Sequence, residues 1–525
     1  PYTTLFRSSG SVRVEGTVDT ATPGTYTLRY VITDKSGNQS VVATRRVTVA
    51  VATNTAPTYP ADTSGTHSTT PWTAPATITD IDAARFLKQA TFGPTEADIA
   101  KVKQIGFSKW IDEQFALPAS SHLEHLDRMA LFKGAQQKLL ELSRTATTLG
   151  LPGAMMPTAS AALNTNDRLY SWWTLAMTSP DQLRQRVALA LSEILVISDR
   201  SGSSLRNFPR GCTNYYDMLV KSVMPGRPYR QLLEEVTLNP IMGTWLTMIR
   251  SSKTKPDENY AREIMQLFSI GLEHLNKDGT FKRDGSGNAI PTYRQDEIRE
   301  LSRAFTGWTY ANSRSFTWTS SADVINPMMS FEDQHDRGQK VIVGGATVSA
   351  GQTAIQDIRR CVDVLAAHPN VGPFMAERLI QRLVTSNPSP AYIFRVSKVW
   401  DDNGKGVRGD LCAVVKAILL DSEARTLGTA PASGKMSEPM IRLSRVMRAL
   451  GRVPSSNPPL LGRYFMWNAL DEIGQWPMQA PTVFNFFTPS YAPPGPVLDA
   501  GFVSPEFEIT TELKIGRASC RERVS

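Results

Sequence analysis

The chain has 525 residues, of which 41% are hydrophobic, and its formal net charge is +8 at neutral pH. This length allows two or three domains, and a mild positive charge without Lys/Arg runs between aromatic residues argues against a nucleic-acid partner. A run of about eighteen apolar residues, which a membrane-spanning helix needs, is absent from the sequence.

Both ends of the sequence resemble translated adapter DNA. Residues 1–8 (PYTTLFRS) and 515–524 (IGRASCRERV) correspond to a widely used short-read sequencing adapter and to its reverse complement. Such segments are set aside before fold reasoning. We therefore expect residues 1–8 and 515–525 to be artefacts, and residues 9–514 to be a metagenomic fragment cut at both ends.

Residues 9–50 have the pattern of a partial β-module. Apolar and polar residues alternate through Tyr26, Leu28, Tyr30 and Ile32, as in a half-buried strand, and turn-forming residues separate such runs. The stretch Thr22 to Ser40, TPGTYTLRYVITDKSGNQS, resembles the last strands of bacterial Ig-like repeat modules. The resemblance implies a spacer in an exported protein, built from two or three antiparallel strands.

Residues 51–78 are rich in Thr, Pro and Ala and have no apolar period. This composition is typical of a linker, and it predicts an extended, protease-exposed tether between the β-module and the rest of the chain.

From Asp80 onward the apolar period becomes helical. Thr95 followed by Asp98 is a capping box, and Ser179-Pro180 followed by Gln182 is a second helix start. Strands are expected at a hairpin near 280–291 and at 341–347. The fold class predicted is therefore mainly α, a large multi-helix domain at 79–514 with a minor β-hairpin, after a truncated all-β Ig-like sandwich module. Further helices are expected near 123–146, 257–274, 295–306, 354–367, 372–384, 391–402, 410–420 and 437–451.

Five stretches of this region, in order, are similar to motifs of the bacterial domain-of-unknown-function 1800 family. They are LNPIMGTWL from Leu238, ENYAREIMQLFSIGL from Glu258, RAFTGW from Arg303, HDRGQKVIVGG from His335 and PTVFNFFTPSYAPPG from Pro481. The resemblance implies an exported bacterial protein without an established activity. Some members carry Trp-His-x-His-Phe after a Leu-Arg-x-Arg motif. This chain reads Leu191-Ser-Glu-Ile-Leu195 there, which argues against a histidine metal site.

Two expected helices carry polar stripes at helical spacing. The first has Asn259, Arg262, Glu263 and Gln266, and the second has Asp296, Arg299, Glu300 and Arg303. One interpretation is a pocket wall, in which Glu263 and Glu300 form a catalytic carboxylate pair and arginines hold an anion. The other is a structural network, with Arg262 bridging to Glu300 and Arg303 to Glu263.

His335 and Asp336 lie in a polar loop, FEDQHDRGQK. A loop histidine can act as a general base or be an ordinary surface residue. We predict the catalytic candidates Glu263, His335, Asp336 and Glu300, and the substrate-binding candidates Asn259, Arg262, Gln266, Arg303 and Trp308. No metal set is predicted, because the histidines and cysteines lack zinc-ligand spacing, and no cofactor is identified.

Common catalytic signatures are absent: no G-x-S-x-G elbow, phosphate loop, dinucleotide fingerprint or H-E-x-x-H occurs. The aromatic run from Pro481 to Gly495 could line a groove or seal a core. Two hypotheses remain for a secreted, periplasmic or cell-surface protein. One is a hydrolase or lyase on an extracellular polymer, with an extracellular polysaccharide or envelope component as partner. The other is a non-catalytic surface binding or scaffold protein with Ig-like spacers.

Overall fold

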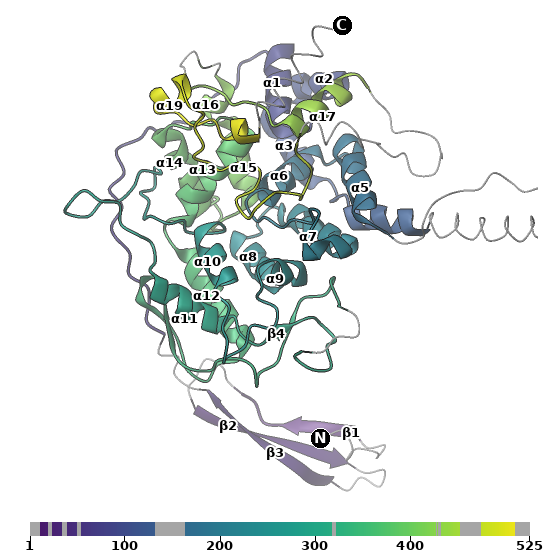
Figure 1. The fold of residues 1–525 in the computed structure, drawn as a ribbon, viewed down its shortest axis with the longest axis vertical. Coiled ribbons are helices and arrows are strands. Elements are labelled where there is room, and N and C mark those ends of the chain that lie inside the picture. Colours follow the sequence, from purple (N-terminus) through teal and green to yellow (C-terminus); the bar gives the residue numbers. More distant parts are fainter. Residues whose placement is uncertain are drawn as a thin grey trace, which may run out of the picture. The chain divides into compact units, whose positions relative to one another are not determined.

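The chain is described here from a computed structural model (Figure 1), which covers residues 11–18, 24–33, 39–49, 54–131, 163–317, 322–426, 428, 432–451 and 474–509. It divides into two compact units, Pro1–Ala56 and Pro57–Ser525. The first unit contains strands and the second is mostly helical, which confirms the predicted fold class.

The first unit contains one antiparallel sheet in the order β1-β2-β3. Tyr26, Leu28 and Tyr30 are half-buried and alternate with exposed residues, as predicted. The register shifts between Tyr30 and Val31, where β3 carries an extra residue, and Val31 is buried. The strands are β1 (Ser11–Glu15), β2 (Gly24–Thr33) and β3 (Gln39–Val49).

The second unit begins with a group of helices that surround a shared apolar core. Residues 122–131 are also helical, and the rest of the helix expected at 123–146 lies outside the described residues. The elements of this half are α1 (Asp80–Ala90), α2 (Glu96–Ile105), α3 (Phe107–Ala116), α5 (Thr165–Thr178), α6 (Gln182–Ser192), the 3-10 turn η1 (Ser204–Asn207), α7 (Pro209–Ser222), α8 (Tyr229–Leu238) and α9 (Pro240–Trp245).

The remaining half adds helices and two short β-ribbons. The ribbon of β6 with β7 falls where a strand segment was expected, and isolated bridges such as Arg283 to Ala289 form the predicted hairpin. The elements are α10 (Asn259–Gln266), α11 (Gln295–Ala304), β4 (Trp308–Thr309), β5 (Met329–Ser330), β6 (Lys340–Ile342), η2 (Val343–Gly345), β7 (Ala346–Val348), α12 (Ala354–Ala367), α13 (Val371–Leu383), α14 (Pro390–Asp401), α15 (Leu411–Leu420), α16 (Ser422–Arg425), α17 (Pro439–Ala449), α19 (Pro496–Asp499) and η3 (Pro505–Ile509).

The starts of α2 and α6 differ in how they are capped. Thr95 and Asp98 form the predicted capping box, with Thr95 Oγ1 accepting from the Asp98 amide at 3.1 Å. The prediction for Ser179 is wrong: it ends α5, and α6 starts after Asp181. The physical reason is that Gln182 turns its side-chain amide onto the carbonyls of Ala176 and Ser179, which joins the two helices through a tight corner.

The segment 57–78 belongs to the helical unit rather than hanging free. It has no helix or strand, but the Thr58 amide donates to the Gly344 carbonyl at 2.9 Å, and Thr63 donates to the Asn276 side chain. Tyr59 packs edge-on against His368, with ring centroids 4.2 Å apart. A free tether is therefore wrong for this segment, which we call the strap (residues 57–78), although most of its residues are exposed. Figure 1 shows it as a purple line along the helical unit that leads into α1.

In the part of the chain that the structure describes, none of the helices combines the length and the apolar character needed to cross a bilayer.

Candidate functional site

The polar stripe of α10 lies partly inside the protein. Glu263 is buried, and its Oε2 has no hydrogen-bond partner. Burial raises the pKa of Glu263 above its usual value, while Arg262 acts in the opposite direction. Arg262 points instead to Glu258 and Gln295, at 3.5 and 3.3 Å, and Asn259 is exposed. Glu263 is thus a buried carboxyl group close to arginine but without an ion pair.

The second stripe, on α11, forms an ion cluster with the loop after β5. Arg303 donates to Glu300 at 2.7 Å from one side of its guanidinium and to Asp336 at 2.8 Å from the other. These hydrogen bonds, the one to Asp336 first, raise the pKa of Arg303 above its usual value. The bridges predicted between the two helices, Arg262 to Glu300 and Arg303 to Glu263, are not those observed, because each arginine reaches a carboxylate closer to it.

His335 is buried and uses both ring nitrogens internally. Its Nδ1 lies 3.0 Å from the Thr306 carbonyl oxygen, and its Nε2 lies 3.2 Å from Asp357 Oδ2. The same carboxylate oxygen accepts from Lys340 Nζ at 2.6 Å. This arrangement ties the loop to α12 and leaves neither nitrogen of His335 free for a substrate.

Two further candidates differ in position. Trp308, on β4, is buried, and its indole Nε1 has no hydrogen-bond partner. Gln266, at the end of α10, is half-buried and lines a large cavity. Of the nine residues predicted from the sequence, Gln266 is therefore the one that forms part of this cavity's wall.

This cavity has a volume of about 520 Å³, which lies within the range of small-molecule sites. One face of α13 forms its floor, with residues at i, i+3, i+4, i+7 and i+8. These are Phe374, Glu377, Arg378, Gln381 and Arg382. The other walls come from the ends of α6 and α10, the hairpin after α10 and the C-terminal segment, and include Glu193, Gln266, Leu272, Glu273, Phe281, Phe484 and Val503. In Figure 1, α6, α10 and α13 lie near the middle of the helical unit.

Glu193 brings a carboxyl group from the end of α6 to the cavity wall, where it interacts electrostatically with the buried carboxyl group of Glu438. The two side chains are almost fully buried, at 6% and 1% exposed. Burial, and then the charge of Glu438, raise the pKa of Glu193 well above its usual value. Burial alone would also raise the pKa of Glu438, but Lys435, the hydrogen bond from Glu193 and two arginines lower it to about 2. The surroundings therefore favour the proton on Glu193 and the charge on Glu438.

Two arginines accompany this pair. Arg382 Nε lies 3.1 Å from Glu193 Oε2, at an angle too poor for a hydrogen bond, and its guanidinium stacks on Phe487 at 4.4 Å. Arg186 Nη2 lies 4.0 Å from Glu438 Oε1. The Nε and Nη1 atoms of both arginines are buried without hydrogen-bond partners. The two arginines act to lower the pKa of Glu193, but burial and the charge of Glu438 outweigh them.

Sequence reasoning missed this pair because Glu193 and Glu438 are 245 positions apart and each stands alone in its own helix context. One signal was available: the polar residues of α13 follow a helical stripe, as those of α10 and α11 do. A second was Arg186 in the Leu-Arg-x-Arg motif, since it is followed by the apolar run Val187 to Leu191 and an arginine buried in such a helix often has an acidic partner.

Within the described ranges, no group of three His, Cys, Asp or Glu side chains is arranged to hold a metal ion. Cys212, Cys361 and Cys412 are free and buried. For each of the three, burial raises the thiol pKa well above its usual value, so they are not nucleophile candidates.

Comparison with known proteins agrees with the two units. The sequence model of a bacterial surface protein Ig-like domain matches residues 6–49. Neither the curated proteins nor the solved structures include a match to the chain. The model described as protein of unknown function (DUF1800) matches residues 85–519, most of the chain. The chain therefore belongs to the DUF1800 family and carries a bacterial surface Ig-like domain before it.

Proposed function

We propose that the helical unit is a surface-associated hydrolase or lyase that cleaves an extracellular polymer in the cavity beside Glu193. The observation that carries this proposal is the Glu193–Glu438 pair, in which the surroundings push the two pKa values apart. When the pKa values of two carboxyl groups are pushed apart in this way, the group with the raised pKa is suited to act as the proton donor. The Ig-like unit supports a surface location and hence a substrate outside the cell.

In this proposal Glu193 donates its proton to the leaving oxygen as the bond to carbon breaks. In hydrolysis, a water molecule adds to that carbon and loses a proton to a base, for which Glu273 and Glu377 are available on the cavity wall. A lyase uses the same base to remove a proton from the carbon next to the cleaved bond. Glu438 does not line the cavity and acts as a positioning residue, because its charge keeps the proton on Glu193.

The aromatic and apolar side chains of the cavity provide surface for a sugar or other polymer unit. Phe281 and Phe484 are exposed at 49% and 46%, so both rings remain accessible at the rim. Gln266 and Arg378 add polar groups. Glu263 remains a second proposed acid, since its pKa is raised and its Oε2 is unpaired.

The test is a screen of extracellular and cell-wall polysaccharides for new reducing ends and for unsaturated products. With the full chain, we expect product from at least one polymer, and we expect Glu193→Gln to lower the rate by a factor of about 10² to 10⁴. Glu124→Gln, on an exposed side chain, is the matched control and should leave the rate unchanged. His335→Asn and Glu300→Gln test the other site, which was predicted around those residues. Both should lower the rate much less than Glu193→Gln does.

The second candidate function is a non-catalytic surface binding protein. It is favoured by Arg303 and Asp357, which hold Glu300, Asp336 and His335 in internal contacts. Binding of a polymer to the parent and to Glu193→Gln alike, without any product, would support this function and contradict catalysis.

A further inference from the structure

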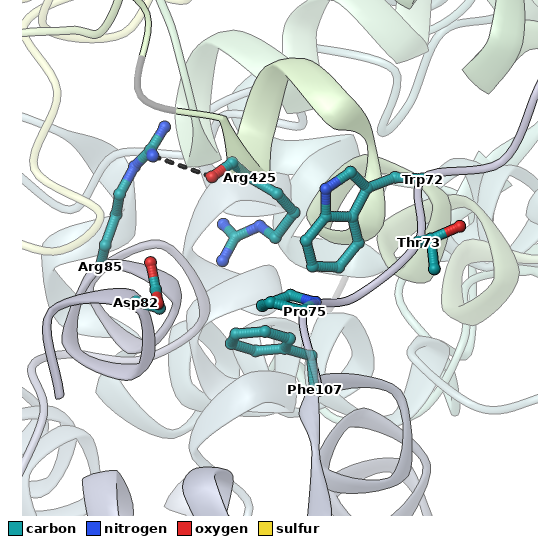
Figure 2. Close-up of a pocket in the computed structure, with 7 residues that line it drawn as sticks. All are labelled: Trp72, Thr73, Pro75, Asp82, Arg85, Phe107 and Arg425. Atoms are coloured by element: carbon teal, nitrogen blue, oxygen red, sulfur yellow. Dashed lines mark hydrogen bonds between the residues drawn. The ribbon is translucent and has the colours of Figure 1, made fainter. Parts of the chain in front are cut away.

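A second cavity, with a volume of about 270 Å³, lies where the strap approaches α1, α3 and α16 (Figure 2). Its lining residues differ from those of the Glu193 cavity. Trp72 and Pro75 come from the strap, Arg85 from α1, Phe107 from the start of α3 and Arg425 from the end of α16.

Arg425 is the central residue of this cavity. Figure 2 shows its guanidinium between Asp82 and Trp72, and its Cζ lies 5.7 Å from the centre of the Phe107 ring. Two of its nitrogens, Nε and Nη2, are buried and have no hydrogen-bond partner. Burial, and then the nearby charge of Arg85, lower the pKa of Arg425 to about 10, so it remains a cation at neutral pH.

The unpaired nitrogens form one edge of the guanidinium, the edge that grips a carboxylate with two parallel hydrogen bonds. Other arginines of this protein use that edge in this way. Arg168 binds Asp199 through Nε and Nη2 at 2.6 and 2.8 Å, and Arg395 binds Asp421 at 2.7 and 2.8 Å. In Arg425 the same edge forms no ion pair with a carboxylate of the residues that the structure describes.

The charges around the Arg425 guanidinium favour binding of an anion. Arg85 donates to the backbone carbonyls of Arg425 and Thr426, so its guanidinium fixes α16 while adding a second positive charge. Asp82 caps α1, with its Oδ2 accepting from Thr79 at 2.6 Å. Two cations therefore face one carboxylate, and the cavity has a net positive charge.

We propose that this cavity binds a ring compound that carries a carboxylate, with the carboxylate on the guanidinium of Arg425 and the ring against Trp72. Trp72 and Phe107 lie 5.8 Å apart between ring centroids and supply the apolar surface that a flat ring or a sugar face covers. The volume suits one such ring rather than a polymer chain. Because Trp72 belongs to the strap, an occupied site also ties the strap to the helices.

Isothermal titration of the full chain with four probes tests this site: glucuronate, benzoate, glucose and acetate. We expect glucuronate or benzoate to bind at least about tenfold more tightly than glucose, which lacks the carboxylate, and than acetate, which lacks the ring. Whichever of glucuronate and benzoate binds more tightly indicates whether the natural ring is a sugar or an aromatic ring. Inorganic phosphate should not compete at the same concentration.

Variants assign the contacts. Arg425→Lys removes the two-pronged edge and Trp72→Ala removes the ring surface, and each should weaken binding by about tenfold or more. Arg210→Lys, which alters an exposed pair with Asp127, is the matched control and should bind as the parent does. If Arg425→Lys fails to fold, Trp72→Ala and the four probes on the parent still test whether the cavity binds such a compound. Equal binding of glucose and glucuronate, equal competition by phosphate, or full binding by Trp72→Ala would overturn the proposal.

Discussion

At the scale of single residues, burial decides what a charged side chain can do in this protein. Asp357 and Glu263 are both buried carboxyl groups on helices, but only Asp357 has a cation in contact, Lys340, which is itself buried. A buried ion pair is costly to break because the remaining charge has no water to replace its partner. A buried carboxyl group without a partner can instead keep its proton.

This contrast predicts opposite outcomes for two similar substitutions. Asp357→Asn should lower the free energy of unfolding by about 3 to 5 kcal/mol, since Lys340 would remain buried and unpaired. Glu263→Gln should change it little or raise it, because no ion pair is lost. Urea unfolding at neutral pH measures both, with Asp296→Asn as the exposed control. A large loss in Glu263→Gln would show that Glu263 has a structural role and remove it from the proposed acids.

At the scale of elements, the strap shows how a segment without secondary structure is held in place. Its backbone is anchored at Thr58 by Gly344 and at Thr63 by Asn276. His67 Nε2 lies 3.0 Å from Asp278 Oδ2, and the Lys277 amide donates to Asp62. These contacts come from the hairpin after α10 and from η2, so the strap depends on elements far away in sequence.

Hydrogen exchange tests these anchors separately. Asn276→Ala removes the acceptor of the Thr63 amide and hydroxyl, so exchange at Thr63 should become at least about tenfold faster. The Thr58 amide, held by the backbone of Gly344, is the internal control and should stay protected. Rapid exchange at both amides in the parent would mean that the strap is not held on the helical unit.

At the scale of the whole molecule, the Glu193–Glu438 pair links stability to pH. The folded-state pKa of Glu438 is about 2, below its ordinary value of 4.5, so its contribution is present above 4.5 and is lost as pH falls toward 2. The pKa of Glu193 is raised, so the folded state binds more protons than the unfolded state above 4.5. Its contribution is therefore lost as pH rises from 4.5 through its folded-state pKa.

Thermal unfolding of the full chain across pH checks these signs. Glu193→Gln, which resembles the protonated acid, should reduce the decline in melting temperature above pH 4.5 and match or exceed the parent at high pH. Glu438→Gln should remove the part of the stability loss at low pH that comes from Glu438. It should also shift the alkaline limit of any activity to lower pH, because the charge of Glu438 no longer raises the pKa of Glu193. Parallel pH curves for the parent and Glu193→Gln would contradict the assigned protonation.

The sequence by itself determined the local features: the helical period from Asp80, the Thr95 capping box, the alternation in β2 and the family motifs. These depend on neighbouring residues and need no knowledge of distant contacts. Only the tertiary structure decided that His335 is tied to Asp357, that the strap lies on the helices, and that Glu193 meets Glu438 across 245 positions. Charge pairing and burial depend on which segments meet in space, and a single sequence carries no period or spacing that records such meetings.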